Sequence, residues 1–241
     1  MGAIQTALQM IYPPRCLGCG GLVESDFGLC GPCWRDTPFI GGLVCNGCGL
    51  GLPGDVGDGT DLCDECLRVA RPWSQGRCAL LYRDRGRRLV LSLKHGDRHD
   101  IARPAAKWMK LAAKPMLEPD MLVAPVPLHW TRLFRRRFNQ SALLATALAE
   151  ETGLTDCPDL LIRHKRTPSL DGLTRDQRFA TLADTLRVNL VHRGLIAGRK
   201  VLLVDDVMTS GATLAAAAEA CLAAKARDVC VVALARVAKD A

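Results

Sequence analysis

The stretch that decides the fold runs Val201-Leu202-Leu203-Val204-Asp205-Asp206-Val207-Met208-Thr209-Ser210-Gly211-Ala212-Thr213. Its first four residues are apolar without a break, which predicts a strand buried on both faces. Two adjacent acids follow, then a short turn rich in hydroxyl groups, and then a helical pattern over 214–225. The polar residues are therefore expected at the carboxyl edge of the strand, where open α/β sheets bind ligands.

Each part of this stretch has a physical use in holding a sugar phosphate. A helix N-terminus offers unpaired N–H groups and the positive end of a dipole, which suits a phosphate. Gly211 lets the backbone approach closely, and the carboxylates can accept hydrogen bonds from a ribose diol. An ordinary turn with Thr209 or Ser210 as the helix N-cap is the alternative. A cap does not explain two acids beside a buried strand, where unpartnered carboxylates are costly.

Outward from this loop, strands and helices alternate from residue 71 onward. Strands are expected over 78–83, 121–126, 201–204 and 229–234, and helices over 85–94, 101–113, 140–151 and 214–225. The polar, basic segment 163–182 is expected to form a long loop, or a loop with a short helix. Alternation of this kind predicts an α/β fold with a mainly parallel sheet flanked by helices.

Eight of the twelve cysteines lie in the first 66 residues, in four C-x-x-C pairs. Two such turns can close a tetrahedral four-thiolate zinc site, so the pairs predict two zinc ions. The expected ligands are Cys16, Cys19, Cys30, Cys33, Cys45, Cys48, Cys63 and Cys66. Four thiolates leave no open position for water, which indicates structural zinc.

Disulfides are the competing interpretation of these cysteines, and a reducing cytosol disfavours them. We prefer sequential grouping, in which neighbouring pairs share one ion, and an interleaved cross-brace stays open. The segment has few large apolar residues, so it is expected to need metal in order to fold. Cys78, Cys157, Cys221 and Cys230 are isolated and are expected to be core residues.

Composition limits the partners and the location of the protein. The formal net charge of +7 favours anionic partners, either phosphorylated small molecules or nucleic acid, although a charge serving only solubility is also compatible. Aromatic residues make up 5% of the chain, which argues against a surface that stacks many bases. Residues 1–12 have helical spacing rather than a secretory pattern, and no apolar run is long enough to span a membrane. A cytoplasmic location is expected.

The stretch 201–213 resembles the phosphoribosyl-pyrophosphate motif of type I phosphoribosyltransferases. With cysteine pairs in front of it, the whole chain resembles the ComF family of competence-associated, phosphoribosyltransferase-like proteins. The segment 124–140, which ends in Arg136-Arg137-Phe138-Asn139-Gln140, and the basic segment 163–181 resemble two further parts of that family. Lys94-His95-Gly96-Asp97 resembles another. The family's domains would divide this chain into a double zinc ribbon over 1–70 and a phosphoribosyltransferase-like domain over 71–241.

The resemblance implies roles for residues of this chain. Asp205 and Asp206 would hold the ribose hydroxyls at the catalytic centre. The phosphate would lie on Thr209, Ser210, Gly211 and Thr213. Arginine suits the oxygens of a pyrophosphate, so Arg136, Arg137 and Arg178 would bind the rest of the ligand, although a solvated basic turn or a nucleic-acid contact fits the same side chains. Magnesium would accompany phosphoribosyl pyrophosphate.

Three positions depart from the family's pattern: Arg137 replaces glycine, Leu170 replaces glutamine and Thr181 replaces asparagine. Two of them lie in the loop that would cover the reaction, so the pattern supports ligand binding more firmly than turnover. Two functions stay open. One is an enzyme that transfers phosphoribose to an unknown acceptor and is linked to DNA uptake. The other is a non-enzymatic competence factor that binds single-stranded DNA or a helicase partner.

Overall fold

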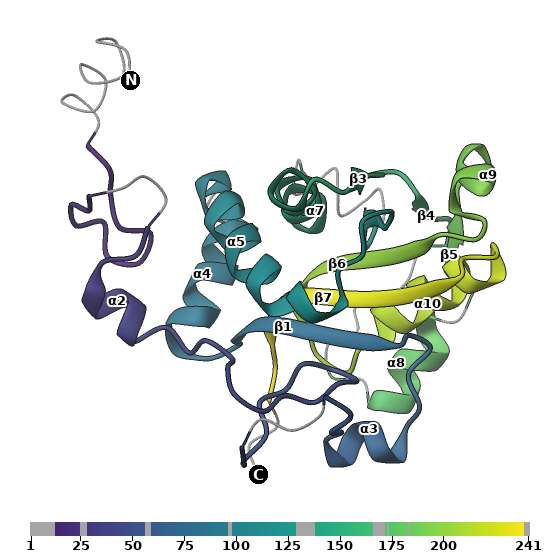
Figure 1. Ribbon diagram of the computed structural model, residues 1–241, viewed down its shortest axis with the longest axis horizontal. Helices are drawn as coiled ribbons and strands as arrows, with labels where there is room; N and C mark the ends of the chain where they lie inside the picture. The colour runs from purple at the N-terminus through teal and green to yellow at the C-terminus, as the bar shows by residue number, and fades with distance from the viewer. Residues whose placement is uncertain are drawn as a thin grey trace.

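A computed structural model of the chain describes residues 13–24, 28–55, 59–95, 98–128, 138–165, 172, 174–182 and 184–238 (Figure 1). Five strands form one sheet in the order β1-β7-β6-β2-β3, and every pairing is parallel. The strands are β1 (Gln75–Leu81), β2 (Leu122–Pro125), β3 (Thr155–Asp156), β6 (Lys200–Met208) and β7 (Asp228–Arg236). The predicted parallel α/β sheet is confirmed.

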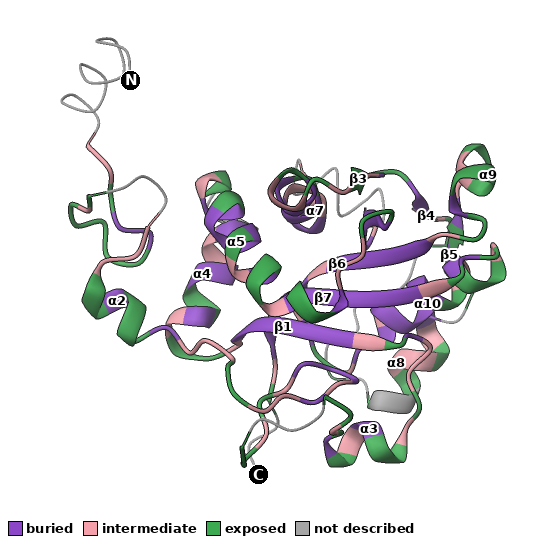
Figure 2. Cartoon of the chain, in the orientation of Figure 1, coloured by how far each residue is buried: buried purple, intermediate pink, exposed green. Residues whose placement is uncertain are grey.

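Helices cover both faces of this sheet (Figure 1). One face carries α4 (Asp84–His95), α5 (Ala102–Ala113) and α7 (Gln140–Thr152), and the other carries α8 (Arg175–Leu182) and α10 (Ala212–Ala223). Alternate residues of β6 supply the two cores: Leu202 and Val204 face α4, α5 and α7, whereas Val201 and Leu203 face α10. Figure 2 shows the central strands buried along most of their length.

Short elements complete the domain. They are η1 (His99–Ile101), η2 (Lys114–Met116), β4 (Leu161–Arg163), β5 (Leu186–Val188), η3 (Leu190–His192) and α9 (Arg193–Ile196). Strands β4 and β5 pair antiparallel and flank the segment that contains α8. Three-residue strands carry too little periodicity to be recognised in a sequence, so neither was predicted.

Strand β6 is longer than predicted. It was expected to end at Val204, but it continues to Met208 because β7 runs alongside it as far as Arg236. Asp205 therefore pairs with Ala233 inside the sheet, and both acids lie in the strand rather than after it. The prediction was wrong because polar side chains usually mark the end of a buried strand. The backbone hydrogen bonds between β6 and β7 do not depend on the polarity of the side chains.

The two cysteine-rich units pack differently on this domain. Each contains a short helix after its third cysteine, α2 (Gly31–Arg35) in the first and α3 (Asp64–Arg68) in the second. The cysteines of the second unit belong to the same apolar cluster as the α10 face of the sheet. The first unit contributes Leu17 to the opposite cluster, and α2 lies toward the α4 side of the molecule (Figure 1). The division of the chain at residue 70 stays a prediction.

Two glycines show how closely the second unit lies on β1. Gly49 has a φ of +68°, and a Cβ added there would stand 2.5 Å from the backbone nitrogen of Cys78. A Cβ on Gly76 would stand 2.6 Å from the carbonyl oxygen of Gly47. No side chain fits between these two backbones, so the turn that carries Cys45 and Cys48 rests directly on the edge strand. Among the described residues, no helix combines the length and apolarity of a membrane span.

We expect Gly49→Ala to lower the free energy of unfolding by several kcal/mol. The substitution adds a backbone clash to a left-handed strain of about 1–2 kcal/mol. The matched control is Gly20→Ala, because Gly20 follows Cys19 with a φ of +76° and open space around its Cα. Gly20→Ala should lower the free energy of unfolding only by the left-handed backbone strain, without the clash. Chemical denaturation of both variants measures the difference, and equal losses would contradict the packing of the second unit on β1.

Candidate functional site: an acid pair and a backbone loop at the sheet edge

The acid pair lies where helices α4 and α7 approach the end of β6. Asp205 Oδ1 accepts a hydrogen bond from Ser141 Oγ at 2.9 Å and another from the Asp206 amide at 2.9 Å. Lys94 Nζ lies 3.0 Å from Asp206 Oδ1, and the Asp206 side chain is 12% exposed. One acid is thus held by neutral donors and the other by a cation.

This arrangement sets the charge of Asp205. Desolvation by the surrounding protein and the neighbouring charge of Asp206 raise the pKa of Asp205 to about 7, and the hydrogen bonds from Ser141 and the Asp206 amide and the charge of Lys94 oppose that rise only in part. A carboxyl held near its titration point in an interior strand is a feature of functional sites. A ligand that favours the ionised form would bind with release of a proton.

The loop after β6 has two distinct sides. Arg236 Nη1 donates to the carbonyl oxygens of Met208 and Thr209 at 3.3 and 2.6 Å, and Arg71 Nη1 donates to the carbonyl oxygen of Ser210 at 2.8 Å. Because a trans peptide points its C=O and the following N–H in opposite directions, the amides of 209–211 face away from both arginines. Within the described part of the chain, the amides of Ser210 and Gly211 donate to no acceptor. Successive free amides of this kind form an anion-binding concavity.

Helix α10 begins at this loop without a side-chain cap. Its N-cap is Gly211, with a φ of +79°, so neither Thr209 nor Ser210 is the N-cap residue of the alternative interpretation. Ser210 Oγ does accept a long bond from the Ala212 amide at 3.4 Å, and Thr213 lies in the first turn. A helix leaves its first-turn amides without backbone acceptors, so the N-terminus of α10 extends the concavity beyond Ala212.

The segment before α7 positions Ser141. Asn139 caps α7 by accepting from the Ser141 amide at 3.1 Å, and its Nδ2 donates to the Val126 carbonyl at 3.1 Å. The start of α7 is therefore tied to the end of β2, with Ser141 directed at Asp205. Sequence analysis missed Ser141, and it noted Lys94 only through a resemblance of its segment. No spacing rule links either residue to β6, and only the fold brings them there.

The predicted arginine ligands are less completely placed. Arg136 and Arg137 lie outside the described residues, as does Leu170. Arg178 lies on α8, which packs against α10, the helix that follows the loop. Thr181 lies on the same helix and donates from its hydroxyl to the Gln177 carbonyl at 2.6 Å.

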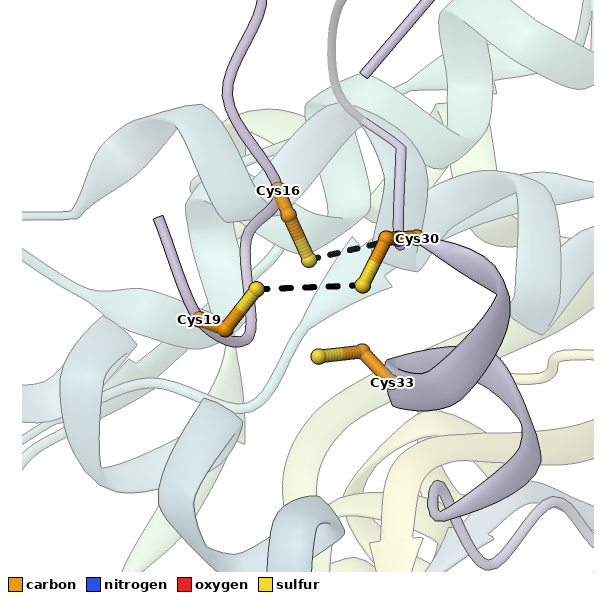
Figure 3. Close-up of side chains that lie close together, drawn as sticks. All are labelled: Cys16, Cys19, Cys30 and Cys33. Atoms are coloured by element: carbon orange, nitrogen blue, oxygen red, sulfur yellow. Dashed lines mark hydrogen bonds between the residues drawn. The ribbon is translucent and has the colours of Figure 1, made fainter. Parts of the chain in front are cut away.

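The eight N-terminal cysteines gather in two clusters. Cys16, Cys19, Cys30 and Cys33 form one, and Cys45, Cys48, Cys63 and Cys66 form the other, with all sulfurs of a cluster within 4.8 Å of one another. Neighbouring pairs therefore share a site, and the interleaved grouping does not occur. Figure 3 shows the first cluster, with its four thiols converging on one point.

The dimensions of the clusters suit zinc. Four sulfurs at about 2.3 Å from one ion stand about 3.8 Å apart at the corners of a tetrahedron. The Cys19–Cys30 and Cys48–Cys63 sulfur distances are both 3.7 Å. In each cluster the amide of the third cysteine also donates to the first sulfur, at 3.2 Å from Cys30 to Cys16 and 3.3 Å from Cys63 to Cys45. Equivalent N–H···S bonds mark two copies of one zinc-ribbon turn.

A third group of possible metal ligands, Cys157, Asp159 and His192, was not recognised in the sequence. Here His192 Nε2 lies 2.8 Å from Asp159 Oδ1, so the half-buried His192 and the exposed Asp159 satisfy each other. Cys157 is buried, and desolvation raises its pKa to about 11. Like Cys78, Cys221 and Cys230, it is the core residue that was expected.

Comparison with known proteins agrees with this architecture. Residues 7–67 match the model of the double zinc ribbon domain, and residues 141–241 match that of the phosphoribosyl transferase domain. A glutamine phosphoribosylpyrophosphate amidotransferase structure from B. subtilis aligns with 59% of this chain and 30% of its own, at 19% identity and a TM-score of 0.39. The two family models place a double zinc ribbon before a phosphoribosyl transferase domain in this chain.

Relatives along most of the chain identify the family. The DNA utilization protein YhgH of Salmonella typhi is 31% identical over 82% of this chain and 86% of its own length. Competence protein F of Haemophilus influenzae is 28% identical over 83% of this chain and 87% of its own length. The chain belongs to the ComF family of competence and DNA-utilization proteins.

The cysteine geometry predicts two zinc ions per chain. Replacing Cys16 and Cys19 by Ser should remove one ion, and replacing Cys45 and Cys48 by Ser should remove the other. Each cluster contains all four of its own ligands. Metal analysis of purified protein counts the ions. Loss of both ions from the first variant, with the rest of the chain still folded, would contradict independent sites.

The raised pKa of Asp205 predicts an unusual dependence of stability on pH. The unfolded carboxyl titrates near ~3.9 and the folded one near 7, so the folded state binds more protons between these values. The contribution of this group to stability is fully present below about pH 4 and is lost as the pH rises through 7. Asp205→Asn should therefore raise the melting temperature at pH 8 and leave it almost unchanged at pH 4. Asp100→Asn is the control. Arg98 lowers the pKa of Asp100, so the ionised carboxyl of Asp100 stabilises the fold, and its removal should lower the melting temperature at pH 8.

Proposed function

We propose that this protein binds phosphoribosyl pyrophosphate together with Mg²⁺ and transfers its phosphoribosyl group to an unknown acceptor. We link this activity to DNA uptake and natural competence. One observation carries the proposal: an acid pair adjoins a loop whose amides face away from their own protein. Carboxylates and free amides side by side match a ligand that has a diol at one end and a phosphate at the other. We also place the protein in the cytoplasm.

In this proposal Asp205 and Asp206 accept hydrogen bonds from the ribose hydroxyls. The 5′-phosphate lies on the amides of 209–213, with the hydroxyl groups of Thr209, Ser210 and Thr213 as further donors. The pyrophosphate is bound by the arginines that the family resemblance assigns to it, Arg136, Arg137 and Arg178. Lys94, which pairs with Asp206, would share that carboxylate with the ligand.

The donor set fits magnesium. Mg²⁺ prefers carboxylate and phosphate oxygens and keeps several waters. The second carboxylate oxygen of Asp205 and that of Asp206 accept no hydrogen bond within the described residues, so both are available. When bound, the ion would neutralise charge that develops on the departing pyrophosphate.

Transfer by this chain amounts to a displacement at the anomeric carbon of the sugar. The acid pair would fix the ribose ring and the amides its phosphate, so the anomeric carbon would be held in one orientation for attack. The bond to the pyrophosphate oxygen breaks and that oxygen keeps the electron pair, which the arginines stabilise. The acceptor supplies the new bond and gives up its proton to solvent, since no described side chain stands out as a general base.

The family names support the link to DNA. One relative is named for competence and another for DNA utilization, and this chain carries a net charge of +7. The same charge favours the alternative function, in which a non-enzymatic competence factor binds single-stranded DNA or a helicase partner and the sugar-phosphate site serves as a sensor.

We expect phosphoribosyl pyrophosphate with Mg²⁺ to raise the melting temperature of the wild-type protein by several degrees, as a ligand present at about 100 times its Kd contributes about 2.7 kcal/mol. Asp206→Asn and Asp205→Asn should abolish the rise, because each removes a carboxylate that holds the ribose. Ribose-5-phosphate without pyrophosphate should give a smaller rise.

Asp228→Asn is a matched control, because Asp228 is a carboxylate at the opposite end of the sheet. It should keep the full rise. A wild-type protein that shows no shift up to millimolar ligand would overturn the proposal. Salt-sensitive binding of single-stranded DNA that falls in Arg135→Ala and Arg136→Ala would then favour the non-enzymatic alternative.

A further inference from the structure

One carboxylate joins the second zinc site to two buried arginines. Glu65 lies between the ligands Cys63 and Cys66, on helix α3. Its two oxygens lie 3.5 Å from Arg71 Nη2 and 3.2 Å from Arg236 Nη2. The two arginine side chains are only 4% and 3% exposed.

The same arginines hold the phosphate-facing loop from behind. Arg236 donates to the carbonyls of Met208 and Thr209, and Arg71 donates to that of Ser210. At their other side, both arginines lie against Glu65, between the ligands Cys63 and Cys66. Each guanidinium therefore spans from helix α3 of the second zinc ribbon to the backbone of the loop.

Trp73 closes the remaining space between the zinc ribbon and the loop. Its Nε1 donates to the Gly47 carbonyl at 2.7 Å, inside the turn between Cys45 and Cys48. A Cβ added to Gly211 would stand 3.0 Å from Arg71 Nη1 and 3.1 Å from Trp73 Cη2. The loop thus rests directly on residues that follow the second zinc site.

The position of Glu65 makes this contact dependent on the metal. The second ribbon is expected to need zinc in order to fold, and Glu65 lies on α3 between two of its four cysteines. Without the ion, nothing holds α3 and Glu65 against Arg71 and Arg236. Two buried guanidinium groups then lose their carboxylate, and burial of unpaired charge is costly. The arginines are then expected to leave their places, and the loop loses its anchors.

We propose that Arg71 and Arg236 are positioning residues that make the shape of the ribose-phosphate loop depend on the occupancy of the second zinc site. The idea deepens the proposed function and rests on it for the identity of the ligand. By anchoring the carbonyls of 208–210 toward the ribbon, the arginines aim the following amides at the phosphate. The first zinc site has no such connection among the described residues: its neighbouring arginine, Arg85, pairs with Asp36.

The test compares Arg71→Gln and Glu65→Gln with Arg77→Gln in the full chain. Arg77 is the matched control, because it is 7% exposed and bonds Asn46 of the same ribbon without contacting the loop. Zinc content is measured first, and two ions per chain are expected in every variant. Hydrogen exchange of the loop amides 209–213 is then followed without ligand, and the Kd of phosphoribosyl pyrophosphate with Mg²⁺ is measured by calorimetry.

Arg71→Gln and Glu65→Gln should exchange these amides about tenfold faster and raise the Kd about tenfold, the loss expected for a hydrogen bond to a charged group. Arg77→Gln should change neither quantity, even if it lowers the melting temperature. If Arg71→Gln loses zinc or fails to fold, Glu65→Gln decides, because glutamine keeps the size of the side chain and removes only its charge.

A reciprocal measurement uses the wild-type protein. Because coupling between two sites acts in both directions, bound phosphoribosyl pyrophosphate should slow the release of one of the two zinc ions to the indicator 4-(2-pyridylazo)resorcinol. Equal loop exchange and equal Kd in Arg71→Gln, Glu65→Gln and wild type would overturn the inference while leaving the proposed function intact. A wild type that does not bind the ligand overturns the proposed function, and the exchange experiment still decides whether the arginines anchor the loop.

Discussion

Two carboxylates on consecutive residues of an interior strand repel each other, and much of the site exists to make that arrangement tolerable. Asp206 is paired with Lys94 from α4, and Asp205 receives Ser141 from α7. These donors come from two helices on one face of the sheet, so the helices must approach the same strand end. The residual cost is visible in Asp205, whose pKa rises to about 7. Residues that lower the stability of a natural protein are often found at its functional sites.

The loop after β6 must meet two opposing requirements: its backbone must be rigid, and its amide N–H groups must stay free to donate. Backbone amides attract a phosphate only if nothing in the protein occupies them, yet an unbonded loop has no reason to keep one shape. In this chain the carbonyls of 208–210 carry the bonds that fix the loop, and the amides stay free. One peptide group can do both because its two dipole ends point in opposite directions. Arg71, which follows the second zinc ribbon, and Arg236 of β7 supply the fixing side, and Glu65 of that ribbon pairs with both.

The sequence was informative wherever a signal is local. The apolar run 201–204, the helical spacing of 140–151 and the four C-x-x-C turns predicted a buried strand, a helix and two four-thiolate clusters, and the structure has all of them. It was uninformative where the partner is distant. The extension of β6 to Met208 depends on β7, and the roles of Ser141 and Arg236 depend on which strands become neighbours. Arg71 was noted only as a boundary, because a single arginine after a cysteine pair carries no pattern.

The anchoring of the loop bears on how an enzyme and a sensor could share this fold. Turnover requires the site to release its products, so the loop cannot be held so firmly that the phosphate stays bound. A sensor requires that binding alter another part of the molecule. The inferred anchoring of the loop by Arg71 and Arg236 would satisfy the second requirement, because ligand on the amides and metal in the ribbon would then be coupled. The departure at Thr181, whose hydroxyl turns back onto its own helix, lies on the segment that would cover the reaction. If the proposed ribose-phosphate site is linked to the ribbon in this way, the chain would be better suited to register its ligand than to turn it over quickly. Transfer by this chain is therefore expected to be slow relative to binding, and a measured rate of pyrophosphate release that approaches the rate of ligand dissociation would show that the altered cover does not limit the reaction.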